Sequence, residues 1–511
     1  MRALILLVAC VVLPCVGTAQ CPDGSQAPCQ SRSVPQRSVA VLPFKNNGAD
    51  PSQQYFADGI TDAITDALAQ LTGVKVASRS SAFALRDRNI SARAMAESLG
   101  VATLVEGSVL RAGSRVRVSA RLIDAKSGFA MWAETVTRDE ADIFELQDTV
   151  SRAIAGRLGA ASVTDRQRVA KRGPASTEAH DLYLRGRSSI YRRDAPSILA
   201  AIDAFKQSIR ADARYAPAYA GLSSAYSLYL VLHVWPALSK ATSPDSTYGW
   251  AARSLAAANR AIELDSGLAE GWAARGYIKL FASTTPDDTE RDFRRALQIR
   301  PGYSEAYGWL GQLFAFNDRA PEAMEAATRA VELDPIAIGM RAGFSSTAFA
   351  SREYARALEL ARAVRMARPD LALAHEYEAL ALMMLGRPED CLVLSGLPAG
   401  LDAMCLQAAG RDAEGASRVA ALAEDWERGG RAPYQMLNLL YYFGHSGRVD
   451  EFKKWLSLGY ERFPLSGATD AGGLYDALYR QENGNARAYF EGLRQAAWER
   501  VQRESRAVVL P

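Results

Sequence analysis

Histidine and cysteine, on which most metal centres and many nucleophilic sites depend, are scarce in this chain. Its 511 residues include 4 His and 6 Cys. The histidines are scattered and form no His-x-x-x-His or Glu-x-x-His spacing. The sequence therefore predicts no metal site and no bound cofactor. The four positions are His180, His233, His375 and His445.

Motifs of catalysis are missing as well. The sequence contains no phosphate-binding GxxxxGK[ST] loop, no GxGxxG after a predicted strand and no GxSxG nucleophile elbow. Asp62 and Asp66 stand four residues apart on one predicted helix face. Because no nearby residue type would perturb them, a solvated helix face is expected rather than an acid–base pair. We therefore expect that the chain is not an enzyme.

Excess charge and long hydrophobic runs are also missing. The chain has 60 Lys and Arg against 57 Asp and Glu, a net charge of +3. This balance gives no reason to expect a nucleic-acid partner or a membrane surface. Beyond the first residues, no apolar stretch approaches the ~18 residues that a membrane-spanning helix needs, so no integral span is expected.

The amino terminus is typical of an export signal. A basic Met1-Arg2 precedes an apolar run over residues 3–14, and small residues at 17–19 would allow cleavage before Gln20. Residues 1–19 are therefore predicted to be a signal peptide, and the mature protein is expected in the periplasm. The alternative is an outer-membrane lipoprotein, because residues 7–10 (LVAC) resemble a lipobox.

Four cysteines remain after the predicted cleavage site. Cys21 and Cys29 lie in a Pro-, Ser- and Gln-rich stretch, residues 20–36, which is expected to be a flexible leader. The turn-forming residues 22–24 between them would allow a Cys21–Cys29 disulfide. Cys391 and Cys405 fall on neighbouring predicted helices, where a second disulfide and two buried free thiols are both compatible with the sequence.

Residues 37–160 read as one α/β domain. Short apolar or alternating runs bounded by turn residues predict five strands, and apolar residues at helical spacing predict three helices. The order of these elements fits a mixed sheet with helices on one face. The expected strands are 38–44, 74–78, 102–110, 115–124 and 129–137, and the expected helices are 56–71, 91–99 and 143–158.

The strand over residues 115–124 alternates cleanly between apolar and polar side chains. Such alternation predicts a sheet with one covered face and one polar face. The arginines on the polar face are expected to be solvated, and an anion-binding row is the alternative reading. The apolar set is Val116, Val118, Ala120 and Leu122, and the polar set is Arg115, Arg117, Ser119 and Arg121.

Six motifs in this domain resemble the TolB-like amino-terminal domain that precedes repeat arrays in many bacterial proteins. The resemblance implies a protein-associating or sensory accessory domain, and it carries over no catalytic residues. Relatives often have a winged-helix or nucleotide-cyclase domain in front, where this chain has its predicted signal peptide, so neither role is expected. The motifs are SVAVLPF at 38–44, YFADG at 55–59, LVEGS at 104–108, LID at 122–124, WAE at 132–134 and DIFELQ at 142–147.

A fixed period governs the rest of the chain after a linker expected at 161–178. Pro301, Pro335 and Pro369 are each 34 residues apart, which is the period of the tetratricopeptide repeat and the place of its closing proline. The sequence therefore predicts an all-α tetratricopeptide-repeat solenoid over 179–465, with capping helices at 466–511. The best copy places Tyr307, Leu310, Gly311, Phe314, Ala323, Ala327, Ala330 and Pro335 at the signature positions.

Function is expected to follow from the concave groove of such an array. A groove with aromatic anchors suits a peptide or a partner helix, so we expect a non-catalytic protein–protein interaction scaffold in the bacterial cell envelope. The alternative is a sensory module whose α/β domain binds a small ligand. Six residues are expected near the groove, unless they pack between helices: Tyr277, Phe281, Gln312, Phe316, Phe349 and Met383.

Overall fold

The computed structural model describes most of the chain from residue 35 onward. The expected signal peptide, the leader with Cys21 and Cys29 (apart from Pro35) and the linker up to residue 175 lie outside the described residues. The described residues are 35, 37–159 without 72 and 87, 176–234, 244–282, 285–395, 397, 400–428, 439–462 without 441 and 445, and 484–511.

The amino-terminal domain contains one mixed sheet of six strands. In the order β3-β1-β4-β5-β6, β1 is parallel to β3 and β4, and β4, β5 and β6 form an antiparallel meander; β2 pairs with β4 in parallel. This agrees with the mixed sheet predicted from the sequence. The strands are β1 Ser38–Val41, β2 Lys45–Asn46, β3 Lys75–Val76, β4 Thr103–Ala112, β5 Arg115–Asp124 and β6 Ala130–Asp139.

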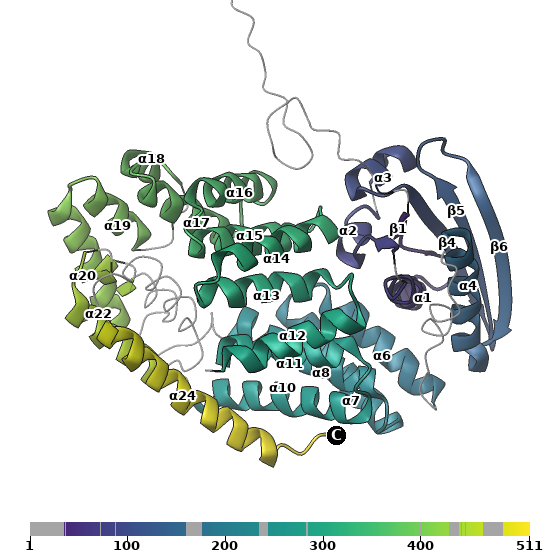
Figure 1. Ribbon diagram of the computed structural model, residues 1–511. Helices are drawn as coiled ribbons and strands as arrows, with labels where there is room; N and C mark the ends of the chain where they lie inside the picture. The colour runs from purple at the N-terminus through teal and green to yellow at the C-terminus, as the bar shows by residue number, and fades with distance from the viewer. Residues whose placement is uncertain are drawn as a thin grey trace, which may run out of the picture. The chain divides into compact units, whose positions relative to one another are not determined.

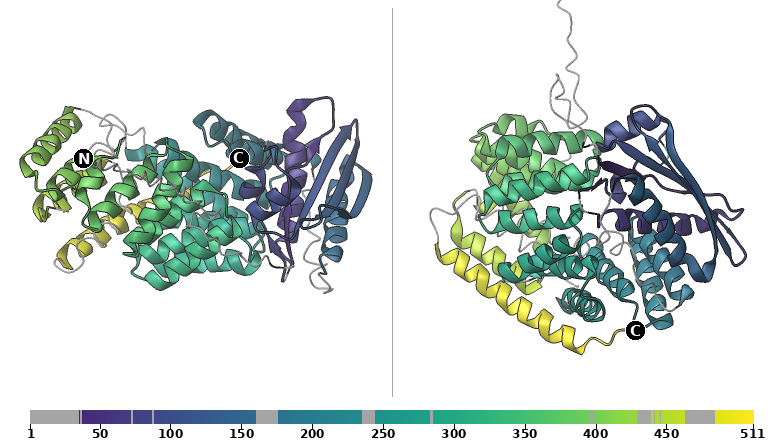
Figure 2. Two further views of the ribbon diagram at one scale, coloured as in Figure 1. Left: turned by 90° about the horizontal axis from the view of Figure 1, so that it is seen from above. Right: turned by 45° about the vertical axis from the view of Figure 1, so that its right-hand side comes forward.

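Helices cover both faces of the sheet, so the expectation of helices on one face was wrong. Val39 and Val41 of β1 share a core with α1 (Gln54–Leu68) and α4 (Ile143–Arg157), whereas Ala40 and Leu42 pack with Leu85, just after α2 (Arg79–Phe83), and with α3 (Ala92–Leu99). Successive side chains of a strand point to opposite faces, so an all-apolar strand needs cover on both. Figures 1 and 2 show α4 lying along the long strands β4 to β6.

The alternation predicted for β5 is confirmed. Val116, Val118, Ala120 and Leu122 are at most 4% exposed, whereas Arg115, Arg117 and Arg121 are exposed. Arg121 forms an ion pair with Glu106 of β4 at 2.5 Å on the open face. The polar face is therefore a solvated sheet surface at these positions.

Helix pairs follow from Thr177 onward and stack side by side (Figure 1). The 34-residue period reappears as successive helical hairpins, in agreement with the repeat solenoid predicted from the sequence, although α8 and α10 are separated by a longer connection than the other pairs. The pairs are α6 Thr177–Ile190 with α7 Ala195–Ala211, α8 Ala216–Tyr229 with α10 Pro244–Leu264, α11 Ala269–Ala282 with α12 Pro286–Ile299, α13 Ser304–Phe316 with α14 Ala320–Leu333, α15 Ile338–Ala350 with α16 Tyr354–Ala367, α17 Ala372–Met384 with α18 Pro388–Leu392, and α19 Leu401–Ala408 with α20 Asp412–Arg428.

Glycine allows the paired helices to approach closely. A Cβ on Gly276 of α11 would lie 2.6 Å from the ring of Phe293 on α12, and a Cβ on Gly186 of α6 would lie 2.6 Å from the ring of Phe205 on α7. Both phenylalanines are fully buried. Small residues at these crossings therefore set the packing of each hairpin.

The carboxyl-terminal part adds three features. Cys391 on α18 and Cys405 on α19 form a disulfide, with Cα atoms 5.9 Å apart, which decides between the two alternatives left open by the sequence. Among the described residues, two further helices follow, α22 (Val449–Arg462) and α24 (Gly484–Ala507). Trp498 and Val501 of α24 pack on α10 together with η3 (Leu230–Val234), so this helix covers early repeats.

Among the described residues, no helix combines the length and the apolar content that a membrane span requires.

Candidate functional site

The six groove candidates lie on the first helices of four successive repeats. Tyr277 and Phe281 are on α11, Gln312 and Phe316 on α13, Phe349 on α15 and Met383 on α17. Phe349 and Met383 are 1% and 8% exposed and belong to the core of the later repeats, where they pack between helices. The other four side chains are partly exposed, so only these can contact a partner directly in this conformation.

Tyr277 is the centre of an aromatic cluster, which we define as Tyr277, Phe281 and Trp309. Its ring centroid lies 5.0 Å from that of Phe281 and 4.6 Å from that of Trp309 on α13. Trp309 was not among the six candidates, and the candidates on the same helix were Gln312 and Phe316. The repeat period alone does not select it.

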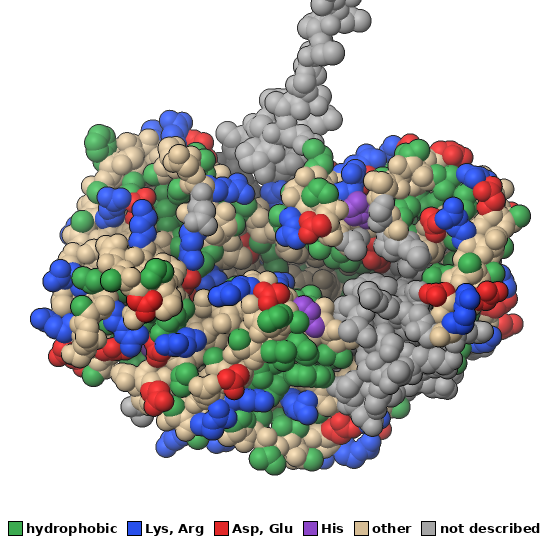
Figure 3. Space-filling model, turned by 180° about the vertical axis from the view of Figure 1, so that it is seen from behind, with side chains coloured by type: hydrophobic (Ala, Val, Ile, Leu, Met, Phe, Trp, Pro, Cys, Tyr) green, Lys and Arg blue, Asp and Glu red, His purple; other side chains and the backbone are tan. Residues whose placement is uncertain are grey.

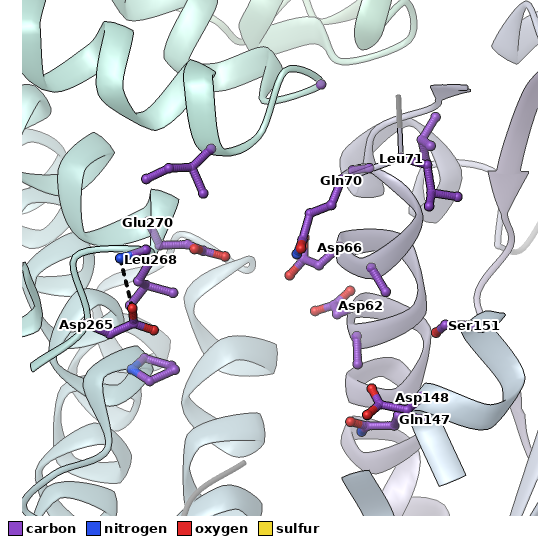
Figure 4. A pocket seen from close by; sticks show the side chains of 18 of the residues that line it. Asp62, Asp66, Gln70, Leu71, Gln147, Asp148, Ser151, Asp265, Leu268 and Glu270 are labelled. Atoms are coloured by element: carbon purple, nitrogen blue, oxygen red, sulfur yellow. Dashed lines mark hydrogen bonds between the residues drawn. The ribbon is translucent and has the colours of Figure 1, made fainter. Parts of the chain in front are cut away.

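A cavity of about 1340 Å³ lies between the sheet domain and the first repeats. Figure 4 shows side chains of α1 and α4 on one side of it, and Asp265, Leu268 and Glu270 on the other. Three helices each contribute residues at positions i, i+3, i+4 and i+7, which place them on one helix face. The sets are Gly59, Asp62, Ala63 and Asp66 of α1; Phe144, Gln147, Asp148 and Ser151 of α4; and His180, Tyr183, Leu184 and Arg187 of α6.

Helix α4 therefore has one face in the core under the sheet and another face that lines the cavity. Leu146 and Val150 are buried in the core under the sheet, whereas Gln147, Asp148 and Ser151 line the cavity. The sequence predicted only the first of these faces. Burial raises the pKa of Asp148 from 3.8 to about 6, although the nearby charge of Arg152 opposes this shift. The carboxyl group thus titrates much closer to neutral pH than an exposed aspartate.

On α6, His180 lies on the helix face that lines the cavity. Its side chain is 6% exposed, and Nδ1 lies 3.1 Å from the hydroxyl of Tyr215. The ring of Phe144 from α4 meets the imidazole edge-on at 4.6 Å between centroids. Burial lowers the pKa of His180 to about 4, so the ring is neutral at pH 7.

Asp62 and Asp66 are not the solvated pair that the sequence suggested. Asp62 is 6% exposed and accepts hydrogen bonds from Arg79 and, at 3.4 Å, from Arg187 of α6. Asp66 forms an ion pair with Arg300 at 2.7 Å. Burial raises the pKa of Asp66, while the charge of Arg300 opposes the shift and that of Glu270 adds to it. These aspartates are not solvated because the repeats cover this face of α1, which the sequence of the helix alone does not show.

The two domains are joined by ion pairs and hydrogen bonds along this interface. Arg300, which is 12% exposed, bridges Asp66 of α1 and Glu270 of α11. Burial by itself would lower the pKa of Arg300, but Glu270 and Asp66 raise it overall, so the guanidinium stays charged.

A second set of contacts lies at the turn between α14 and α15. The hydroxyls of Ser80 and Ser81 donate to the buried carboxylate of Asp334, and the amide of Ile336 donates to Ser81 Oγ at 3.0 Å. Burial raises the pKa of Asp334, and the serine hydroxyls oppose that shift. Asp181 of α6 also accepts hydrogen bonds from Tyr55 and Arg111 of the sheet domain, so the sheet domain is fixed to the array at several places.

Close packing completes the interface. Leu184 of α6 belongs to the sheet-domain core, and a Cβ on Gly59 of α1 would lie 2.5 Å from it.

No set of three His, Cys, Asp or Glu side chains within the part of the chain that the structure describes is arranged to hold a metal ion. What this arrangement offers chemically is hydrogen bonding from amide, hydroxyl, imidazole and carboxylate groups beside aromatic rings.

Comparison with family models gives one match to the amino-terminal domain. The model described as "HilA/YgeH-like transcriptional regulator, second domain" matches residues 35–153. This stretch contains all six strands, α1 to α3 and most of α4. The TolB-like resemblance of the same region stays a prediction.

A curated protein is similar to part of the chain. "Putative adenylate cyclase 3" of Rhizobium meliloti (strain 1021) is 39% identical over 187 residues, which are 36% of this chain and 32% of that protein. The chain thus matches about a third of the length of this relative. The finding contradicts the expectation that the chain is not an enzyme, because the shared segment is part of a protein named for a catalytic activity.

Solved repeat proteins are similar to the helical part. YrrB, "a TPR protein with an unusual peptide-binding site", is 18% identical, with 42% of this chain and 97% of that chain covered and a TM-score of 0.28. A thermophilic TPR protein from Thermus thermophilus, TTC0263, is 22% identical, with 41% of this chain and 98% of that chain covered and a TM-score of 0.28. At such scores the likeness adds no structural argument, and the repeat fold rests on the helix pairs of this chain.

Proposed function

We propose that this chain binds other proteins or peptides in the groove formed by the first helices of its repeats. The observation that carries the proposal is the aromatic cluster of Tyr277, Phe281 and Trp309, whose rings are partly exposed on consecutive first helices. Aromatic side chains provide large contact areas with few rotatable bonds, and they are enriched among residues that dominate binding energy. Gln312 and Phe316 extend the same surface along α13.

Selection of the partner would depend on apolar contacts more than on net charge. The protein has a net charge of +3, and acidic and basic side chains are interspersed over the face shown in Figure 3. Surfaces of mixed sign produce no strong field of one sign. This supports a protein or peptide partner held mainly by aromatic anchors.

The proposed location is the cell envelope, most simply the periplasm. The disulfide between Cys391 and Cys405 supports it, since disulfides persist in oxidising compartments and are rare in the reducing cytosol of most bacteria. The export signal predicted from residues 1–19 points the same way.

The test is site-specific photo-crosslinking in the native envelope. A crosslinking residue at Gln312 should capture a defined partner, whereas the same residue at Met366, which is 66% exposed on α16, should not. The captured protein is identified by mass spectrometry and purified. Crosslinking at both positions with equal yield would contradict a groove-specific interaction.

Binding of the purified partner then tests the aromatic cluster. The double variant Tyr277→Ala and Phe281→Ala should weaken affinity by tenfold or more, on the order of 1.4 kcal/mol or greater, because two anchors lose their contact area. Met366→Ala is the matched control and should bind like the unmodified protein. Equal affinity of all three proteins would rule out this groove.

A further inference from the structure

Three buried polar groups that line the cavity have no hydrogen-bond partner among the described residues. They are the side-chain amide Nε2 of Gln147, the hydroxyl of Ser151 and Nε2 of His180, and their residues are 7%, 1% and 6% exposed. Unpaired buried polar groups are rare in folded proteins, because each one loses its hydration without compensation. Three of them around one cavity are typical of a site completed by a ligand.

The three groups belong to two helices that meet at this end of the cavity. Gln147 and Ser151 are four residues apart on α4 and therefore share a face. His180 lies on α6, and its ring is in edge-on contact with Phe144 of the same α4 face. The packing of Phe144 against His180 thus holds the two helices in a fixed relation.

The hydrogen-bonding character of these groups defines the chemistry of the ligand. Gln147 Nε2 can only donate, while a serine hydroxyl donates and accepts. His180 is neutral at pH 7, and its Nε2 donates or accepts according to the role of Nδ1 toward Tyr215. Hydroxyl groups of a ligand are suited to all three, because each hydroxyl can both donate and accept.

The charges and rings around the cavity narrow the class further. The carboxylate side chain of Asp148 is on the same face of α4, and those of Asp62 and Asp265 also line the cavity. Arg187 and Arg214 line the cavity as well, so charges of both signs offset each other and favour a ligand without net charge, while Asp148, beside Gln147 and Ser151 on α4, can pair with an amine. The aromatic rings of Phe144 and Tyr183 offer apolar surface for the carbon faces of a polyol ring.

We propose that the cavity between α1, α4 and α6 binds a neutral or amine-bearing polyhydroxylated small molecule, such as a mono- or disaccharide. Gln147, Ser151 and His180 hydrogen-bond its hydroxyl groups. Because the cavity is lined by both domains, a bound molecule contacts the sheet domain and the repeats together. Binding therefore stabilises their docked arrangement and can influence the array.

The test is a calorimetric and thermal-shift titration of the full chain with sugars of matched shape and different charge. The probes are glucose, maltose and glucosamine, compared with glucose 6-phosphate and glucuronate, each at millimolar concentration. At least one of the first three should release or absorb binding heat and raise Tm, and the anionic pair should not. No heat and no shift with any of the first three probes overturns the proposal, and so does tighter binding of the anions.

Variants separate a ligand-binding role from a structural one. In Gln147→Leu and Ser151→Ala the unpaired group is removed, so the Tm of the free protein should stay the same or rise. Affinity for the sugar should fall about tenfold. Glu145→Gln, an exposed position on α4, is the control and should leave binding unchanged. A lowered Tm of the free variants together with undiminished sugar binding would overturn the assignment.

Discussion

At the scale of single residues, burial decides how this molecule responds to pH. The pKa of His180 falls to about 4 because its ring is buried, although the nearby charge of Asp181 opposes this shift. The unfolded chain would protonate this ring near its ordinary value of 6.5. Between these two values the unfolded state binds more protons than the folded state, so stability decreases as the pH falls through this window.

Replacement of the imidazole should remove that dependence. Going from pH 7.5 to pH 5, the unmodified protein should lose about 2 kcal/mol of unfolding free energy through His180 alone. His180→Gln keeps a group able to hydrogen-bond Tyr215 but does not titrate, so its stability should fall less over the same interval. Chemical denaturation at the two pH values measures the difference.

Asp148 affects the pH dependence of stability in the opposite direction and therefore provides a control. Its pKa is raised from 3.8 to about 6, so the folded state binds more protons than the unfolded state in that window. This contribution to stability is present at low pH and is lost as the pH rises through about 6. Asp148→Asn should therefore make the protein lose more stability on acidification than the unmodified chain. If both variants changed the pH dependence in the same direction, burial would not be the cause.

At the scale of helices, the repeats depend on close crossings. Gly276 packs against Phe293, whose ring is completely buried in the same hairpin. No side chain fits between the two helices at this point, because a Cβ would lie 2.6 Å from the ring. The same residue types recur at Gly186 and Phe205, so the crossing is a property of the repeat and not of one copy.

A single added methyl group at the crossing should destabilise the hairpin. Gly276→Ala is expected to cost about 1–3 kcal/mol through overpacking, and the loss should appear in thermal or chemical denaturation. Gly339→Ala is the matched control, since its Cβ would meet no atom within 4 Å on α15. The control should be neutral or stabilising by up to about 1 kcal/mol. Equal changes in the stability of both variants would mean that the contact of Gly276 with Phe293 does not decide the packing.

At the scale of the whole molecule, a few buried charges hold the sheet domain to the array. Arg300 is the central one, since it pairs with Asp66 of the sheet domain and Glu270 of the repeats and lies 4.1 Å from the ring centroid of Tyr303. Removal of the guanidinium would leave two carboxylates close together without their counter-charge. Burial makes such an arrangement more costly than on an open surface.

Arg300→Gln should therefore loosen the docking of the two domains. The expected cost is about 2 kcal/mol, below the range for fully buried pairs because Asp66 keeps 31% of its side-chain exposure. Hydrogen exchange should become faster at the end of α1 and the start of α11, on both sides of the interface. Arg356→Gln removes an exposed pair with Glu359 and should change stability by less than about 0.5 kcal/mol. Unchanged exchange in Arg300→Gln would show that the contacts of Asp62, Asp181 and Asp334 and the apolar packing suffice.

Much of the architecture could be read from periodic features of the sequence. The three prolines spaced by 34 residues predict the helix pairs, and the alternation of Val116, Val118, Ala120 and Leu122 predicts the covered face of β5. Both patterns are local consequences of helix and strand geometry. They do not predict that α3 packs on the second face of the sheet, since this depends on the tertiary packing of the helix.

Most of the candidate site could not be predicted from the sequence. Asp62, Gln147 and His180 are polar residues on helix faces, and in isolation each face is expected to meet water. On each of α1, α4 and α6, the residues that line the cavity follow the spacing i, i+3, i+4 and i+7. The sequence of one helix does not show that such a second, polar face is covered by another part of the chain.

The sequence by itself determined the secondary structure, the repeat period and the residues that fill each hairpin, because these depend on contacts between near neighbours in the chain. Only the tertiary structure decided that α1, α4 and α6 line one cavity and that Arg300 joins two carboxylates from distant segments. The contact of Arg300 with Asp66 spans 234 residues of the chain. The strength of such contacts depends on burial, and burial is a property of the folded molecule rather than of any segment.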